Sequence, residues 1–249
     1  MFDRLAIHGL QYLGYGLEIV LLGFLLIRGR WKDITSLFLY VTGYVIIDAV
    51  LRPGVLNYYG FKSVQYQYCY WITDVALTLG AFLLIAAFFR RVCKAKRETW
   101  SMVRSMLAAV FVLIAVISYF ALINHYDHLF SRFIVEFQQN LYFACLVLNT
   151  LLYIVLQQTD SANEELSFLV LGLGIEFAGS AASMALMYLT PGGQDAGILA
   201  AFAAQICNLG MFLTWFYAIT QATKKKTVPS YGDSRQVPAL ADAPIRGTR

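Results

Sequence analysis

The chain has 249 residues, of which 59% are hydrophobic and only 14% are charged. Soluble globular domains carry about 25% charged residues, so this composition argues against a soluble protein and for an integral membrane protein. The formal net charge of +4 does not require a nucleic acid partner, because the basic residues lie beside apolar runs, where they more often contact anionic lipid headgroups.

Seven charge-poor runs follow one another along the chain, each near the roughly 20 residues that a helix needs to cross a bilayer. The runs are continuously apolar, without the period-two alternation of a transmembrane barrel. Seven buried helices would also leave a soluble protein no amphipathic helices to cover them. We therefore predict an all-α integral membrane protein, a seven-transmembrane-helix bundle. The predicted helices are 10–27, 34–51, 67–89, 106–123, 141–156, 166–189 and 198–220.

The two ends of the chain differ in character. The first run is preceded by Asp3, contains Glu18 and is followed by basic residues rather than by a small-residue cleavage site. We therefore expect it to remain as the first helix and not to be cleaved as a signal peptide. After Lys226 the composition changes to Pro, Gly, Ser and charge, which cannot bury enough apolar surface to fold. We predict one transmembrane domain over 1–226 and a disordered cytoplasmic tail over 227–249.

The basic residues divide unequally between the two sides of the predicted bundle. Fifteen of the nineteen follow the first, third and seventh helices, and four lie on the other side. Because cytoplasmic loops are enriched in Lys and Arg, we predict an external N-terminus and a cytoplasmic C-terminus in the cell membrane. Tyr66 and Tyr70 belong to a group of tyrosines at the predicted outer boundary, which we interpret as an interfacial aromatic belt.

The first three and the last three predicted helices share features of an internal repeat. Arg52-Pro53-Gly54 follows the second helix as Thr190-Pro191-Gly192 follows the sixth, and Asp74 and Asn208 each precede a basic residue by sixteen positions. One interpretation is a parallel 3+1+3 repeat with the fourth helix as a linker; chance agreement between membrane helices of similar length is the other. Length and topology resemble the sugar-carrying, seven-helix SWEET proteins. The intramembrane prolines of that class are missing, because all five prolines are expected in loops or in the tail, and no helix is expected to have a proline kink.

Six polar residues within the predicted helices are candidates for a functional site. An ionisable side chain at membrane depth costs roughly 2.5 to 3.5 kcal/mol, so such residues normally face the interior and mark ligand sites or ion pathways. Each lies on a polar or small-residue stripe at helical spacing, and we expect the six to line a polar cavity that opens outward. The candidates are Glu18, Asp48, Asp74, Glu176, Gln205 and Asn208.

Three of the four carboxylates also have a purely structural interpretation. Asp48 precedes Arg52 by four positions, so an i,i+4 ion pair at the outer interface accounts for it without a function. Glu18 and Glu176 can be protonated and hydrogen-bonded between helices, since desolvation disfavours the charged carboxylate. Asp74 has no basic residue within four positions on its helix. This lack of a neutralising partner favours a functional role for Asp74.

The helices carry few signs of catalysis or of a bound cofactor. His125 and His128 form a His-x-x-His pattern in a predicted outer loop, where solvated histidines are commoner than zinc ligands, so we predict no metal site. The four cysteines have no CxxC spacing, and we expect neither a disulfide nor a cysteine-based metal site. The last helix has no lysine for a retinal Schiff base, and no phosphate loop, serine elbow or kinase signature is present. We predict no cofactor and favour a protein that is not an enzyme.

Two functions remain open from the sequence. The first is a small-solute or ion transporter that uses the six polar residues as its site. The alternative is a ligand-sensing or partner-binding membrane subunit without catalytic activity. Besides the lipid bilayer and its anionic headgroups, the expected partners are another membrane protein or a second copy of the chain. The stretch from Gly172 to Ala185 is rich in Gly, Ala and Ser, which indicates close helix packing.

Overall fold

The computed structural model describes residues 2–60, 63–93, 97–123, 129–158, 164–190 and 194–227; most of these residues are helical and none of them is in a strand. Within them, seven helical segments are long and apolar enough to cross a membrane, in agreement with the seven predicted runs and with a membrane-embedded, multi-pass protein. The segments are Gly9–Ile27, Thr35–Tyr59, Val64–Val92, Trp100–Phe120, Glu136–Gln158, Glu164–Leu186 and Gly197–Gln221.

Short connections join consecutive helices, as expected from a sequence in which short polar segments separate the apolar runs. A short 3₁₀ helix, η1 (Arg30–Lys32), joins the first helix to the second, and a π-helix, η2 (Ile46–Leu51), lies within the second spanning segment. The α-helices are α1 (Phe2–Ile27), α2 (Thr35–Val45), α3 (Arg52–Tyr59), α4 (Val64–Val92), α5 (Arg97–Ile123), α6 (Leu129–Gln158), α7 (Glu164–Leu189) and α8 (Gln194–Thr227). The predicted tail, beyond Thr227, and the His-x-x-His histidines lie outside the described residues.

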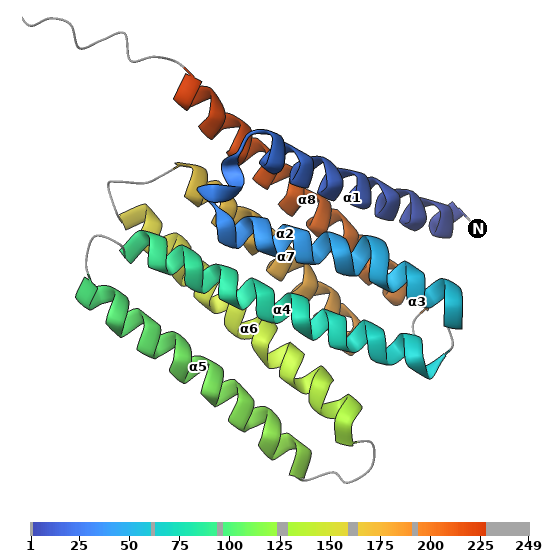
Figure 1. The fold of residues 1–249 in the computed structure, drawn as a ribbon. Coiled ribbons are helices and arrows are strands. Elements are labelled where there is room, and N and C mark those ends of the chain that lie inside the picture. Colours follow the sequence, from blue (N-terminus) through green and yellow to red (C-terminus); the bar gives the residue numbers. More distant parts are fainter. Residues whose placement is uncertain are drawn as a thin grey trace, which may run out of the picture.

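The contacts between helices form a closed series, which we call the ring. α1 packs on α2, α2 and α3 pack on α4, α4 packs on α6, α6 on α7, α7 on α8, and α8 returns to α1. α5 packs mainly on α6 and lies to the side of this ring (Figure 1). A ring of six spanning segments gives each of them one face toward a shared interior, and polar residues on those faces can meet there.

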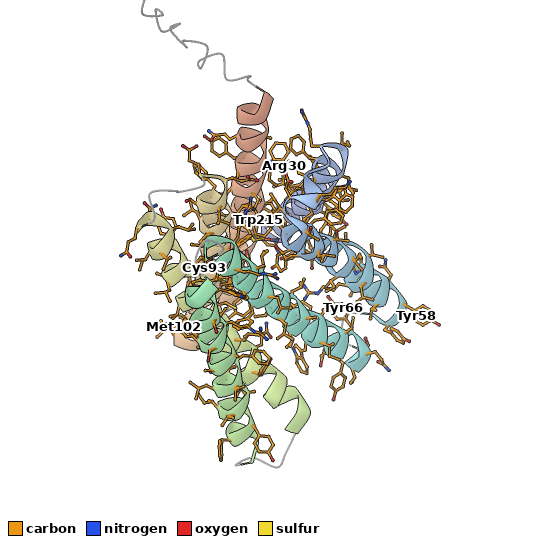
Figure 2. All side chains as sticks on the ribbon, turned by 60° about the vertical axis from the view of Figure 1, so that its left-hand side comes forward. Arg30, Tyr58, Tyr66, Cys93, Met102 and Trp215 are labelled. Carbon is orange, nitrogen blue, oxygen red and sulfur yellow. The ribbon has the colours of Figure 1, made fainter. Side chains whose placement is uncertain are left out.

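The interior of the ring is apolar toward the end where η1 joins α1 to α2. Leu25, Leu37, Phe88 and Trp215 are fully or almost fully buried there, and they belong to one hydrophobic cluster contributed by most of the helices. Figure 2 shows Trp215 and Arg30 in this half of the molecule, and Tyr58 and Tyr66 toward the opposite end. We call that opposite end, where α3 ends and α4 begins, the α3–α4 end.

α7 and α8 make the most extensive helix contact in the ring, and this contact depends on glycine. A Cβ atom added to Gly179 would overlap the side chain of Cys207, and one added to Gly172 would lie 2.6 Å from Nε1 of Trp215. That indole N–H donates to the backbone carbonyl of Leu169 at 2.8 Å. The small residues of this stretch therefore bring two helix backbones together, as their composition predicts.

The prediction that the second helix ends at residue 51, with Pro53 in a loop, is wrong. The helix continues through η2 and α3 to Tyr59, so Pro53 lies inside a spanning segment. Proline has no N–H to donate within a helix and crowds the preceding turn. Here that turn is wider than an α-helical turn, because the N–H of Arg52 donates to the carbonyl of Ile47, five residues earlier. The π-helix thus lets the chain pass a proline without ending the helix.

Candidate functional site

A cavity of about 330 Å³ lies inside the ring, in the half toward the α3–α4 end. It extends along α4 from Tyr66 to Ala81 and along the second spanning segment from Leu56 to Tyr40. Residues of α1, α6, α7 and α8 complete its lining, and no described residue of α5 takes part. This volume is at the lower end of the roughly 300 to 1,000 Å³ found for small-molecule sites.

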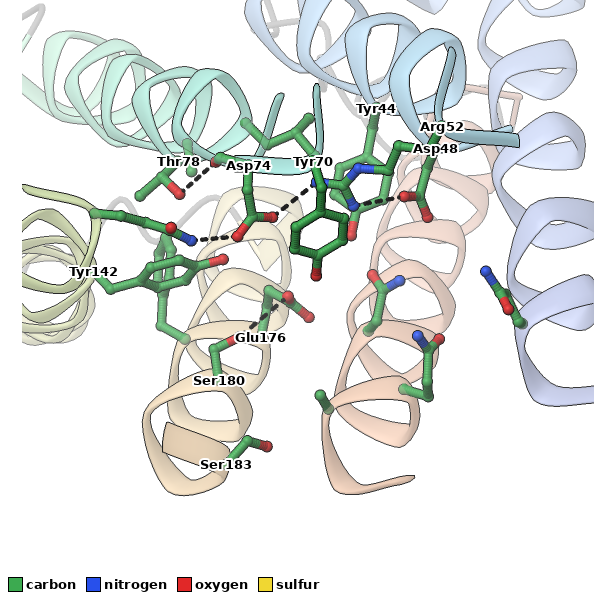
Figure 3. A pocket seen from close by; sticks show the side chains of 18 of the residues that line it. Tyr44, Asp48, Arg52, Tyr70, Asp74, Thr78, Tyr142, Glu176, Ser180 and Ser183 are labelled. Atoms are coloured by element: carbon green, nitrogen blue, oxygen red, sulfur yellow. Dashed lines mark hydrogen bonds and ion pairs between the residues drawn. The ribbon is translucent and has the colours of Figure 1, made fainter. Parts of the chain in front are cut away.

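Arg52 is the centre of the polar network in the cavity wall (Figure 3). Its Nη1 donates to Oδ1 of Asp48 at 2.9 Å, and its Nη2 donates to Oδ1 of Asp74 at 2.9 Å. Nε donates to the hydroxyl of Thr73 at 3.1 Å, and the guanidinium carbon lies 4.4 Å from the ring centroid of Tyr70. One arginine therefore joins the second spanning segment to α4 through two ion pairs, a hydrogen bond and a cation–π contact.

The prediction that Asp74 lacks a neutralising partner is wrong. Arg52 supplies that partner from the neighbouring spanning segment, and Gln138 of α6 donates a hydrogen bond to the other carboxylate oxygen of Asp74. Asp74 is therefore not an isolated carboxylate in the cavity. Transport can no longer be inferred from an unpaired Asp74. The predicted i,i+4 pair between Asp48 and Arg52 is confirmed, although it lies inside the ring wall rather than at the end of a helix.

Glu176 and Asn208 bring unpaired acceptors to the cavity wall. The hydroxyl of Ser180 lies 3.5 Å from Oε1 of Glu176, while Oε2 is buried and has no hydrogen-bond partner among the described residues. Asn208, on α8, is 9% exposed, and its Oδ1 is likewise buried without a partner in the described part of the chain. Buried polar atoms are nearly always hydrogen-bonded, so two unpaired acceptors in one cavity wall need an explanation.

The cavity brings together five of the six residues that the sequence singles out: Asp48, Asp74, Glu176, Gln205 and Asn208. Glu18 does not line it. Gln11 and Tyr15, on the same stripe of α1, do line it, but Glu18 lies one turn farther from the α3–α4 end. Its side chain is 1% exposed, and neither carboxylate oxygen has a hydrogen-bond partner among the described residues. The polar stripe on α1 correctly predicts that Glu18 points inward. It does not predict how deep the cavity extends along α1.

Several tyrosines that line the cavity were not predicted as site residues. Tyr66 and Tyr70 were expected in an interfacial belt, but both line the cavity, as does Tyr142 of α6. Gln138 precedes the predicted start of the fifth helix at residue 141, whereas α6 begins twelve residues before that point, at Leu129. The sequence does contain a pattern that could have identified these two residues, because Gln138 and Tyr142 are four positions apart and therefore lie on one helical face.

A second buried ion pair crosses the ring at the end opposite the cavity. Arg30, in η1, donates a hydrogen bond to Glu165 in the first turn of α7, and their side chains are only 7% and 8% exposed. Arg30 also lies 3.4 Å from Asp33, whose side chain is 48% exposed. The pair links the connection between α1 and α2 to a helix from the last three spanning segments.

Comparison of the chain with protein-family models, with curated proteins and with solved structures yields no match. The described residues contain no group of three or more His, Cys, Asp or Glu side chains that could hold a metal ion, and all four cysteines are free. The cavity wall offers ion-paired carboxylates, an arginine, amides and tyrosine hydroxyls, which are groups suited to holding a polar solute.

Proposed function

We propose that this chain is a transporter that carries a small polar solute or an ion across the membrane, with the cavity around Arg52 as its binding site. The observation that supports this most is that one cavity collects both Asp74 and Glu176 together with polar groups from six spanning segments. Polar groups at membrane depth are costly and are usually retained for a function. A chain selected only for stability in lipid has little reason to keep so many of them around an open space.

The unequal halves of the ring also support transport. The cavity occupies the half toward the α3–α4 end, while apolar side chains and the pair between Arg30 and Glu165 close the other half. A carrier with alternating access has a site open toward one side and closed toward the other in each of its states. In the orientation that the charge distribution predicts, this is an outward-facing state.

The order of helix contacts favours the 3+1+3 repeat. Exchanging the first three spanning segments with the last three leaves the series of contacts around the ring unchanged, and α5 stays outside it. Asp74 and Asn208, which the repeat would make equivalent, both line the cavity. The Pro-Gly correspondence no longer supports the repeat, because Pro53 lies inside a helix and α7 ends at Leu189, before Pro191.

Thiol accessibility from each side of the membrane tests the proposal. In a variant without natural cysteines, Ser180→Cys places a thiol in the cavity wall, and Ala178→Cys, on the exposed outer face of α7, is its matched control. A charged, membrane-impermeant methanethiosulfonate should modify the Ser180→Cys protein from both sides, because alternating access opens the cavity to each side in turn. The control should stay unmodified, since lipid surrounds it.

Two other outcomes contradict transport in different ways. Modification of Ser180→Cys from one side only would indicate a ligand-sensing subunit whose cavity never opens to the other side. No modification from either side would mean that the cavity is closed to water and is not a solute site. Circular dichroism and thermal unfolding of each variant establish that the fold is kept.

A further inference from the structure

We infer that the solute held in this cavity is a small organic cation with N–H donors, of the primary amine class. The inference rests on the proposed function, because it names the class of solute for that same site. Three features of the cavity wall lead to it: its charge balance, its unpaired acceptors and its aromatic lining.

The charge balance of the wall is negative. Among the described residues that line the cavity, three are carboxylates, Asp48, Asp74 and Glu176, and Arg52 is the one basic residue. Both aspartates share that single guanidinium, which leaves Glu176 without a cationic partner in the described wall. An anionic solute would approach three carboxylates, whereas a cation would supply the charge that the wall lacks.

The unpaired atoms in the wall are acceptors. Oε2 of Glu176 and Oδ1 of Asn208 are both buried and lack a donor among the described residues. They lie at a similar depth on neighbouring helices, because Gly179 of α7 faces Cys207 of α8 at this level. An ammonium group has three donors and no acceptor, which matches a wall whose unpaired atoms are acceptors. A solute that offered only acceptors would leave both atoms unpaired.

The remainder of the wall suits an organic body rather than a bare metal ion. Six tyrosines line the cavity among the described residues, and one of them, Tyr70, already holds a cationic guanidinium over its ring at 4.4 Å. Aromatic faces attract organic cations and cover their apolar parts. A divalent metal ion needs several oxygen ligands in a compact shell, and no group of three metal-ligating side chains occurs in the described part of the chain.

Three soluble compounds with one phenol ring and different charges provide the test. They are tyramine, which is cationic, tyrosol, which is neutral, and 4-hydroxyphenylacetate, which is anionic. Binding to the purified full chain in detergent is measured by calorimetric titration and by the shift in unfolding temperature. We expect saturable binding of tyramine, and much weaker or no binding of the other two.

Two variants and a control separate binding at the wall from a general effect. Glu176→Gln should weaken tyramine binding by about tenfold or more, the loss expected for one charge-assisted hydrogen bond. Asn208→Leu removes the second acceptor and should weaken binding in the same direction. Glu18→Gln makes the same chemical change at a buried carboxylate outside the cavity wall and should leave tyramine binding unchanged.

The possible failures are distinguishable. Binding of tyrosol or 4-hydroxyphenylacetate as tightly as tyramine overturns the cationic class, while the proposed transport of some other solute survives. An equal loss in the Glu18→Gln protein also overturns it, because the effect would then not come from the cavity wall. If none of the three compounds binds, the cationic class fails; transport fails as well only if the methanethiosulfonate modifies Ser180→Cys from one side alone or from neither side.

Discussion

Arg52 and Asp74 lie 22 positions apart in the sequence, yet Nη2 of the arginine donates to Oδ1 of the aspartate at 2.9 Å inside the ring. The same arginine holds Asp48, one turn earlier on its own helix, at 2.9 Å. The two carboxylates therefore depend on one cation for their neutralisation. The polar half of the ring has a single centre, and changes at this centre should have larger effects than changes at either carboxylate.

Replacing Arg52 should destabilise the fold strongly. Arg52→Ala leaves two mostly buried carboxylates without a cation, and removing one partner of a buried ion pair costs about 3 to 5 kcal/mol. Asp74→Asn should cost less, because Arg52 keeps Asp48 and the asparagine side chain can still accept one hydrogen bond. Unfolding by titration with SDS in mixed micelles measures both. Equal losses of stability for the two variants would contradict a network centred on the arginine.

Gly179 should tolerate no side chain. Gly179→Ala places a methyl group against Cys207, and such overpacking typically costs about 1 to 3 kcal/mol. Gly23→Ala in α1 is the matched control, since nothing lies within 4 Å of the Cβ that it would gain. That change should be neutral or should stabilise the helix by up to about 1 kcal/mol. Thermal unfolding in detergent compares the two; similar midpoints would rule out close packing of α7 on α8 at this level.

The ion pair between Arg30 and Glu165 should contribute to the stability of the fold because each side chain neutralises the other. Arg30→Ala or Glu165→Ala alone leaves a buried charge and should cost about 3 kcal/mol, and the double variant should be more stable than the sum of the two losses implies. Asp33→Ala should cost less than about 1 kcal/mol, because its side chain is half exposed. A double-mutant cycle of unfolding free energies gives the coupling. A coupling near zero would mean that the two side chains do not depend on each other.

The distribution of basic residues predicts an orientation that is open to direct measurement. A reporter that is active only in the cytoplasm, fused to the C-terminus, should be active, because fifteen of the nineteen basic residues lie on the same predicted side as the C-terminus. A reporter that requires the external compartment, fused to the same position, is the control and should be inactive. Labelling of the C-terminus from outside intact cells would reverse the assignment.

The sequence by itself was sufficient to predict the spanning helices and most of the candidate residues that meet inside the ring. The length and hydropathy of an apolar run are local properties, so all seven spanning segments could be predicted, with boundaries that differ by several residues at some ends. Helical spacing likewise predicted an inward face for Asp48, Glu176 and Asn208, and small residues in α7 predicted a close helix contact, which the structure forms with α8.

Only the tertiary structure decided which polar residues pair and where the cavity ends. Arg52 reaches Asp74 because two helices lie side by side at that depth, and Pro53 remains within a helix because a π-helical turn precedes it. Tyr70 faces the cavity rather than the membrane boundary, and Glu18 lies beyond the cavity by one turn. Lipid and protein interior are both apolar, so hydropathy along one helix does not distinguish its neighbours. The relative rotation and depth of whole helices are set by packing between segments far apart in the sequence.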